Sequence, residues 1–133
     1  MSHNHAVLLL GTNLGNKEKN LSDAKTLIEK RIGTIIRSSI ILETEPEGFV
    51  SEHGFLNQIF WISTPLSPIG LLKSVKSIES EMGRVYLQKE IYEDRIIDID
   101  LLGFRDLIFE SQDLSLPHPQ IHTRTFVKKL LLY

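Results

Sequence analysis

The chain has 133 residues, of which 41% are hydrophobic and 24% charged, and its formal net charge is −2 at pH 7. A chain of this size and composition can bury a core as one domain, residues 1–133, and its charge offers no basic surface for nucleic acid. It contains no cysteine, which excludes disulfides, thiolate metal ligands and a cysteine nucleophile and is typical of a cytoplasmic protein.

The first half of the chain predicts a strand, a helix and two further strands. Residues 5–11, HAVLLLG, form an apolar run closed by glycine, which is too short to cross a membrane and lacks the flanks of a signal peptide. Over residues 16–33, apolar side chains recur at helical spacing, and the final glycine marks where the helix ends. The β-branched run 34–44 predicts a second strand, and 55–64 predicts a third after a polar loop.

The second half opens with a well-marked helix. Ser67 can cap it, Pro68 suits its first turn, and Gly83 follows its apolar stripe. After a polar loop comes a fourth strand, RIIDIDLLGF, at 95–104. The tail is expected to add a short strand at 106–111, a Pro-His-Pro loop and a helix over 123–132.

This order, β-α-β-β-α-β, is that of an α+β ferredoxin-like sandwich. We expect an antiparallel sheet in which the second and third strands pair and both helices cover one face. The tail would form a C-terminal extension with a short helix.

Two aspartates interrupt the apolar fourth strand. Because alternate side chains of a strand share a face, Asp98 and Asp100 point to the same side, with their roots about 6–7 Å apart. Ile97, Ile99 and Leu101 then enter the core. Two such carboxylates repel each other, and a hard divalent cation such as Mg²⁺, completed by substrate phosphates, would compensate them. A solvated sheet face would produce the same alternation.

Basic residues around this strand favour the metal interpretation. Arg84 and Arg95 precede the aspartates, and His118 and Arg124 follow them. Phosphoryl transfer combines metal ions that bridge phosphates with guanidinium groups that hold phosphate oxygens in pairs. The sequence therefore predicts a site for phosphoryl transfer.

Several motifs carry a resemblance to a known family: GTNLGN, TEPEG, FLNQ, IESEMGR, RIIDIDLL and LPHP followed by an arginine and a phenylalanine. In this order and spacing they resemble the 6-hydroxymethyl-7,8-dihydropterin pyrophosphokinases of folate biosynthesis, from about residue 5 to the C-terminus. The resemblance implies a ferredoxin-like fold and a transferase that moves pyrophosphate from ATP to the hydroxymethyl group of the reduced pterin, releasing AMP. It implies ATP and the pterin as partners and two Mg²⁺ ions as cofactors. We expect a cytoplasmic monomer that binds neither nucleic acid nor membranes.

The resemblance also implies roles for individual residues. The catalytic residues would be Arg84, Arg95, Asp98 and Asp100, and the two aspartates would bind the metal ions. The residues expected to contact ATP are Glu79, Arg84, Tyr92, Arg95, Leu101, His118 and Arg124. The residues expected to contact the pterin are Thr44, Pro46, Glu47, Gly48, Phe55, Asn57, Tyr92 and Phe126. The GTNLGN turn lacks the ending of a P-loop, so we expect it to connect a strand to a helix near the site without cradling phosphates.

Other interpretations stay open at this point. Arg84 could be a solvated helix end, and Phe55 and Phe126 could be core residues, as we expect for Trp61. A non-catalytic ferredoxin-like module for ligand binding or regulation would leave the aspartates on the surface, and another phosphotransferase or a nuclease could use the same pair.

The chain also departs from the family pattern. The segment 84–94 is acidic towards its end where relatives often carry arginines, Asp113 stands where some have an arginine, and Tyr92 replaces a tryptophan found in many relatives. We expect 45–54 and 84–94 to close over the substrates.

Overall fold

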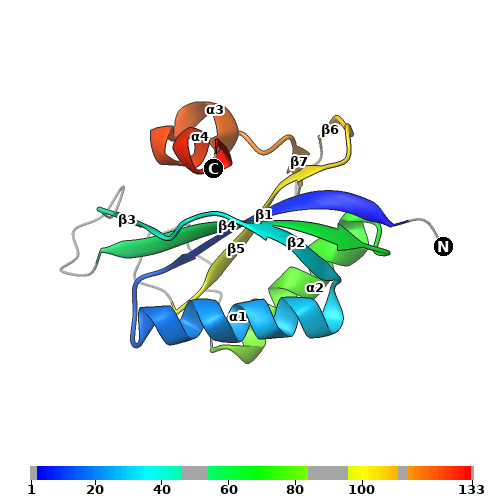
Figure 1. Cartoon of the computed structure of the whole chain (residues 1–133). Helices are drawn as coiled ribbons and strands as arrows, with labels where there is room; N and C mark the ends of the chain where they lie inside the picture. Colours follow the sequence, from blue (N-terminus) through cyan, green and yellow to red (C-terminus); the bar gives the residue numbers. More distant parts are fainter. Residues whose placement is uncertain (1–2, 46–53, 84–95, 111–113, 133) are drawn as a thin grey trace.

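The computed structural model of the protein describes residues 3–45, 54–83, 96–110 and 114–132 (Figure 1). In chain order the elements are β1 (Asn4–Thr12), α1 (Lys17–Arg31), β2 (Thr34–Ser38), β3 (Leu42–Thr44), β4 (Phe55–Thr64), α2 (Pro68–Glu81), β5 (Asp98–Phe104), β6 (Phe109–Glu110), β7 (Ser115–Leu116), α3 (Gln120–Thr123) and α4 (Thr125–Leu131). Within these ranges, no helix is long and apolar enough to cross a bilayer.

The main sheet has five strands and the predicted topology. Its strand order is β2-β4-β1-β5, β3 also pairs with β4, and every pairing is antiparallel. Figure 1 shows α1 and α2 together on one face of this sheet, while α3 and α4 lie on the other face. The ferredoxin-like α+β fold expected from the sequence is therefore confirmed.

The predicted second strand is divided into β2 and β3, so the expectation of one continuous strand over 34–44 is wrong. Between the two strands, the backbone N–H of Ser39 donates to the carbonyl of Ile59 at 2.8 Å. The hydroxyl of Ser39 accepts the N–H of Ile59, also at 2.8 Å. A side-chain oxygen thus takes the place of a backbone carbonyl, and the ladder is interrupted there.

Local signals fix both long helices where the sequence predicts them. The side chain of Asn16 accepts the N–H of Lys19 at 3.1 Å and caps α1. Ser67 caps α2 by accepting the N–H of Gly70 at 3.1 Å, with Pro68 in the first turn. The buried apolar residues of the two helices are Leu21, Ala24, Ile28, Leu71, Val75 and Ile78.

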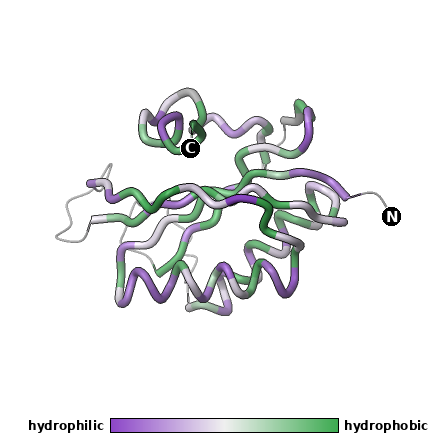
Figure 2. The backbone as a smooth tube through the Cα atoms, in the orientation of Figure 1, coloured by the Kyte–Doolittle hydropathy of each residue, from purple (hydrophilic) through white to green (hydrophobic). Residues whose placement is uncertain are grey.

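Two hydrophobic clusters fill the two sides of the sheet. The larger lies between the sheet and the helices α1 and α2. It includes Ile97, Ile99 and Leu101 of the fourth predicted strand, as expected. The smaller, here called the back cluster, consists of the buried residues Leu9, Ile59, Leu102, Val127 and Leu130. In Figure 2 the outward turns of α1 are hydrophilic, whereas the strands between the layers are largely hydrophobic.

The C-terminal segment closes the second face. The predicted helix over 123–132 begins one turn earlier, because the chain forms a short α3 and then α4, with Arg124 between them as the N-cap of α4. Its residues Val127 and Leu130 pack into the back cluster. This segment therefore brings residues of the tail over the same sheet face as the central strands.

Candidate active site

Pairing of three strands brings Gly11, Asn57 and Asp98 into one row across the sheet. Gly11 of β1 pairs with Asn57 of β4 on one side and with Asp98 of β5 on the other. Since neighbouring strands lie about 4.8 Å apart, the row spans about 10 Å. Leu9 lies two residues before Gly11 in β1, and Ile59 lies two residues after Asn57 in β4, so each shares a sheet face with its neighbour in the row. Both belong to the back cluster, so the row lies on the face that carries α3 and α4.

Gly11 leaves the centre of this row without a side chain. A Cβ atom added at this position would lie 3.4 Å from Oδ1 of Asn57 and 3.6 Å from Cδ1 of Phe55. The glycine therefore faces both side chains. Sequence reasoning placed the GTNLGN turn, which begins at Gly11, near the site. It did not name Gly11 as a site residue, because the position of Gly11 opposite Asn57 and Asp98 depends on strand register.

The amide of Asn57 is held in one orientation. The side chain is buried, with 4% of its surface exposed. Its Nδ2 donates to the carbonyl of Leu42 at 3.1 Å and to Oγ1 of Thr44 at 2.8 Å, which uses both amide hydrogens. Asn57 therefore turns its acceptor, Oδ1, towards Gly11.

Asp98 and Asp100 share the face of this row, as predicted. Both are half-buried, and the neighbouring Ile97, Ile99 and Leu101 are each 4% exposed or less. Among the described residues, no group of three or more histidine, cysteine, aspartate or glutamate side chains could hold a metal ion.

Glu79 and Leu101, both expected to contact ATP, lie on the opposite side of the sheet. Glu79 is 3% exposed, and its Oε2 accepts the backbone N–H of Ile99 at 2.8 Å. This bond ties α2 to the edge strand β5 between the two aspartates. The side chain of Leu101 is buried in the larger cluster, so only its backbone could reach a nucleotide.

His118 lies close to Asp98 and Arg124. Its backbone N–H donates to the carbonyl of Leu102 at 2.8 Å, which fixes the Pro-His-Pro segment to β5. Burial lowers the pKa of the His118 imidazole below its ordinary value of 6.5, the charge of Asp98 raises it, and the charge of Arg124 lowers it again. Burial therefore favours the neutral form of this imidazole beside the two charges.

Arg124 and Phe126 form a stacked pair beside this histidine. The guanidinium carbon of Arg124 lies 4.4 Å from the centroid of the Phe126 ring, which is a cation–π contact. Phe126 also packs against the back cluster. The tail therefore places a positive charge and an aromatic face over the end of the sheet that carries the row.

Comparison with known proteins identifies the family. The model of the family 7,8-dihydro-6-hydroxymethylpterin-pyrophosphokinase (HPPK) matches residues 7–133. The chain belongs to this family. The 2-amino-4-hydroxy-6-hydroxymethyldihydropteridine pyrophosphokinase of Porphyromonas gingivalis is 40% identical over 123 residues, covering 91% of this chain and 84% of that protein. The enzyme of the same name from Bacillus subtilis is 35% identical over 127 residues, covering 94% and 74%.

A solved structure agrees with the fold of this pyrophosphokinase. The HPPK-DHPS of Plasmodium falciparum in complex with SDX-DHP superimposes with a TM-score of 0.80 at 22% identity. The match covers 98% of this chain and 41% of that one, so the pyrophosphokinase chain spans about two fifths of its neighbour.

Six of the predicted residues of the pyrophosphokinase lie outside the described ranges: Pro46, Glu47, Gly48, Arg84, Tyr92 and Arg95. The same is true of Asp113 and of most of the two segments expected to close over the substrates. The described residues that the fold brings to one end of one sheet face are Thr44, Phe55, Asn57, Asp98, Asp100, His118, Arg124 and Phe126. Glu79 and Leu101 are the two that it turns to the other face.

Proposed function

We propose that this pyrophosphokinase binds its pterin over Gly11 and its ATP beside Asp98 and Asp100. The hydroxymethyl oxygen of 6-hydroxymethyl-7,8-dihydropterin would then attack the β-phosphorus of ATP, forming the pterin pyrophosphate and releasing AMP. The observation that carries this proposal is the row in which Asn57, Gly11 and Asp98 occupy paired positions on three adjacent strands.

The chemistry of the row suits a flat heterocycle at one end. The Oδ1 of Asn57 is an acceptor for an N–H group on the edge of a pterin ring, and its orientation is set in advance by the bonds to Leu42 and Thr44. Gly11 gives the ring room to lie against the sheet. Phe55 and Phe126 offer aromatic faces, which stack favourably on a planar ligand. Pro46, Glu47, Gly48 and Tyr92 would complete this half of the site.

The other end of the row suits a triphosphate. Two half-buried carboxylates at alternate positions are oxygen ligands of the kind that Mg²⁺ accepts when phosphates supply the rest. We infer that Asp98 and Asp100 hold two such ions with ATP. When bound, magnesium would neutralise charge on the phosphates and favour loss of the hydroxyl proton.

Cationic side chains of the chain would complete the nucleotide site. The guanidinium of Arg124 is oriented by its stacking on Phe126 and can hold phosphate oxygens in pairs. The neutral imidazole of His118 can donate a hydrogen bond to the nucleotide without adding charge. Arg84 and Arg95 would contact the transferring group from the segment that precedes β5.

Residues 1–133 would act as one monomeric catalytic domain. This domain would work in the cytoplasm, where ATP is supplied.

The identity of the nucleotide product tests this proposal. Purified protein is incubated with ATP at several Mg²⁺ concentrations, with and without the hydroxymethyl pterin, and the nucleotides are separated by chromatography. The proposal expects AMP that forms only when both pterin and Mg²⁺ are present. ADP as the product would refute it. No pterin-dependent turnover would also refute it and would favour a non-catalytic binding module.

A charge-matched pair of variants locates the reaction. Asp98→Asn should reduce turnover at least about a thousandfold, because a carboxylate that holds the metal and the phosphates contributes about 4 kcal/mol to the transition state. Asp23→Asn removes the same charge from an exposed pair with Lys19 on α1 and should leave turnover unchanged. Equal activity of the two variants would show that the carboxylates are not at the reacting centre.

A further inference from the structure

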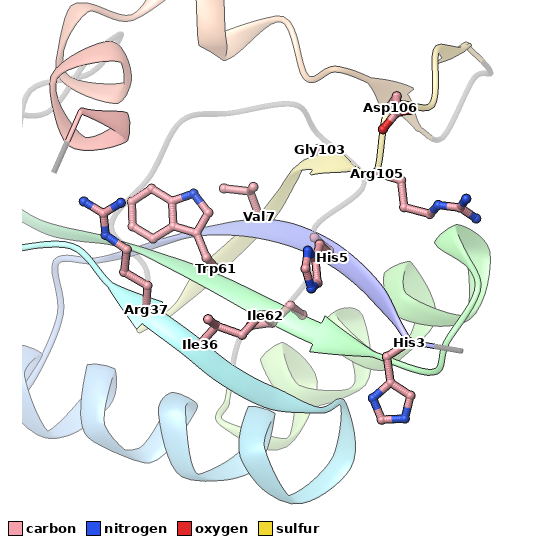
Figure 3. A pocket seen from close by; sticks show the side chains of 11 residues that line it. His3, His5, Val7, Ile36, Arg37, Trp61, Ile62, Gly103, Arg105 and Asp106 are labelled. Atoms are coloured by element: carbon pink, nitrogen blue, oxygen red, sulfur yellow. The ribbon is translucent and has the colours of Figure 1, made fainter. Parts of the chain in front are cut away.

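A second concave site lies on the same sheet face, at the end far from the row of Asn57, Gly11 and Asp98. It is a groove with a volume of about 650 Å³ (Figure 3). Its lining includes His5 and Val7 of β1, Arg37 of β2, Trp61 of β4, and Gly103 and Arg105 at the end of β5. This volume falls within the range of pockets that hold small molecules, about 300–1,000 Å³.

Strand register separates this groove from the candidate active site. Val7 pairs with Trp61 on one side and with Gly103 on the other, just as Gly11 pairs with Asn57 and Asp98. At about 3.3 Å per residue, the two rows lie about 13 Å apart along β1. Leu9 and the rest of the back cluster fill the sheet face between them. The groove is therefore not an extension of the pterin or nucleotide site.

The backbone departs from regular geometry on both sides of the groove. The ladder between β2 and β4 is irregular between Ile35 and Arg37, and the ladder between β1 and β5 is irregular between Val7 and Leu8. Arg105 follows with a φ of 53°, in the left-handed region that side-chain-bearing residues rarely adopt. Such irregularities change the direction in which side chains point and often lie next to binding sites.

Gly103, which pairs with Val7 across β1 and β5, provides an open floor in the groove. A Cβ atom added at this glycine would meet no other atom within 4 Å. Its φ lies outside the left-handed region, unlike those of Gly15 and Gly83, so the backbone does not require glycine there. The missing side chain is thus space on the surface of the groove.

The groove combines an aromatic wall with positive charge. Figure 3 shows the side chains of Arg37, Trp61, Val7, His5 and Arg105 following one another across the sheet. The guanidinium carbon of Arg37 lies 4.7 Å from the centroid of the Trp61 ring, so the indole is held from one side by a cation–π contact.

Two of the three charged side chains that line this groove are basic. Arg37 and Arg105 stand at its two ends, His3 and His5 also line it, and Asp106 is the single acidic side chain in the described lining (Figure 3). A low-dielectric wall of Trp61 and Val7 strengthens the attraction that such groups exert on an anion.

We propose that this groove binds a small planar anion, meaning an aromatic ring that carries a carboxylate or a phosphate. The ring lies over Val7 and Gly103 beside the indole of Trp61. The anionic group is directed towards His5 and Arg105. The proposal does not depend on the reaction at Asp98 and Asp100, since none of the residues that form the row lines the groove.

Trp61 reports on the groove directly, because it is the one tryptophan of the sequence. The indole N–H signal in a ¹H–¹⁵N spectrum is followed while benzoate or phenyl phosphate is added to the whole protein. Benzyl alcohol, acetate and inorganic phosphate are added in parallel, since each lacks either the charge or the ring. We expect a saturable shift with both aromatic anions, at concentrations at least fivefold lower than with any of the three controls.

Benzoate and phenyl phosphate also distinguish the kind of anion, because the probe that binds more tightly shows whether the groove prefers a carboxylate or a phosphate. A shift that does not saturate, or one that benzyl alcohol or the ring-free anions produce at the same concentration, would overturn the proposal.

Two variants test the placement of the ring and of the charge. Gly103→Val places a side chain on the open floor and should abolish the saturable shift, while the remaining spectrum shows that the protein is folded. Arg105→Gln should weaken binding at least fivefold. Arg31→Gln removes the same charge from α1, where Arg31 pairs with Glu81 outside the groove, and should bind like the unchanged protein. Unchanged binding by Gly103→Val or Arg105→Gln would refute the assignment.

Discussion

Adding a single methyl group at Gly11 should separate pterin binding from protein stability. The new Cβ of Gly11→Ala would lie at ordinary contact distances, 3.4 Å from Oδ1 of Asn57 and 3.6 Å from Cδ1 of Phe55. The fold should therefore tolerate it, and the restricted unfolded chain should add about 0.4–1 kcal/mol to the free energy of unfolding. The same methyl group would project into the place that we assign to the pterin ring. An overpacked contact costs about 1–3 kcal/mol, so the KM for the pterin should rise about 5- to 150-fold.

The assay compares KM for each substrate with thermal unfolding of the same variant. The KM for ATP should stay within about twofold, because the nucleotide lies beyond Asp98, at the other end of the row. Gly103→Ala is the matched control, since it adds the same methyl group to the same sheet face where no atom lies within 4 Å. If Gly11→Ala keeps the KM for the pterin of the unchanged protein, or loses stability instead, the pterin does not lie over this glycine.

Three further results follow from contacts near the aspartates. Glu79→Ala leaves the buried N–H of Ile99 without its acceptor and should lower the free energy of unfolding in urea by about 1–3 kcal/mol. Glu79→Gln keeps a carbonyl acceptor, so its free energy of unfolding should fall by less. Equal decreases in the two variants would contradict this role. The pKa of His118, followed by NMR titration, should lie below 6.5. It should fall further in Asp98→Asn and rise in Arg124→Gln. A change of the opposite sign in either variant would show that the substituted charge does not act on His118. Because the unfolded chain takes up the His118 proton first, stability should decrease as the pH falls below about 6.5, and the His118→Gln variant should show less of this decrease.

The order and type of the elements followed from local patterns in the sequence. Ser67 and Pro68 mark the start of α2, and alternation around Asp98 and Asp100 separates the core face of the fourth strand from its polar face. These signals depend on residues close together in the chain, and the fold confirms them. The family resemblance found in the same motifs is likewise confirmed.

Features that depend on contacts between distant segments could not be predicted in the same way. The place of Gly11 opposite both Asn57 and Asp98 requires the register of two strand pairs, and a shift of one residue would reverse every side chain. The interruption at Ser39 depends on a hydroxyl that meets Ile59 from another strand.

Trp61 illustrates the same limit for burial. We expected a core residue, but its ring is only partly buried and forms a wall of the groove next to Arg37. Hydrophobicity alone predicts that a tryptophan packs against apolar neighbours, as Trp61 does against the back cluster. It does not reveal that the same residue also lines a groove beside Arg37.

A crystal structure with Mn²⁺ in place of Mg²⁺, a non-hydrolysable ATP analogue and the pterin would test the assigned site most directly. Anomalous scattering identifies manganese without ambiguity. We expect manganese within about 2.5 Å of carboxylate oxygens of Asp98 and Asp100 and of the phosphates, with the pterin ring over Gly11. Manganese and phosphates bound elsewhere, with both carboxylates directed into solvent, would refute this assignment.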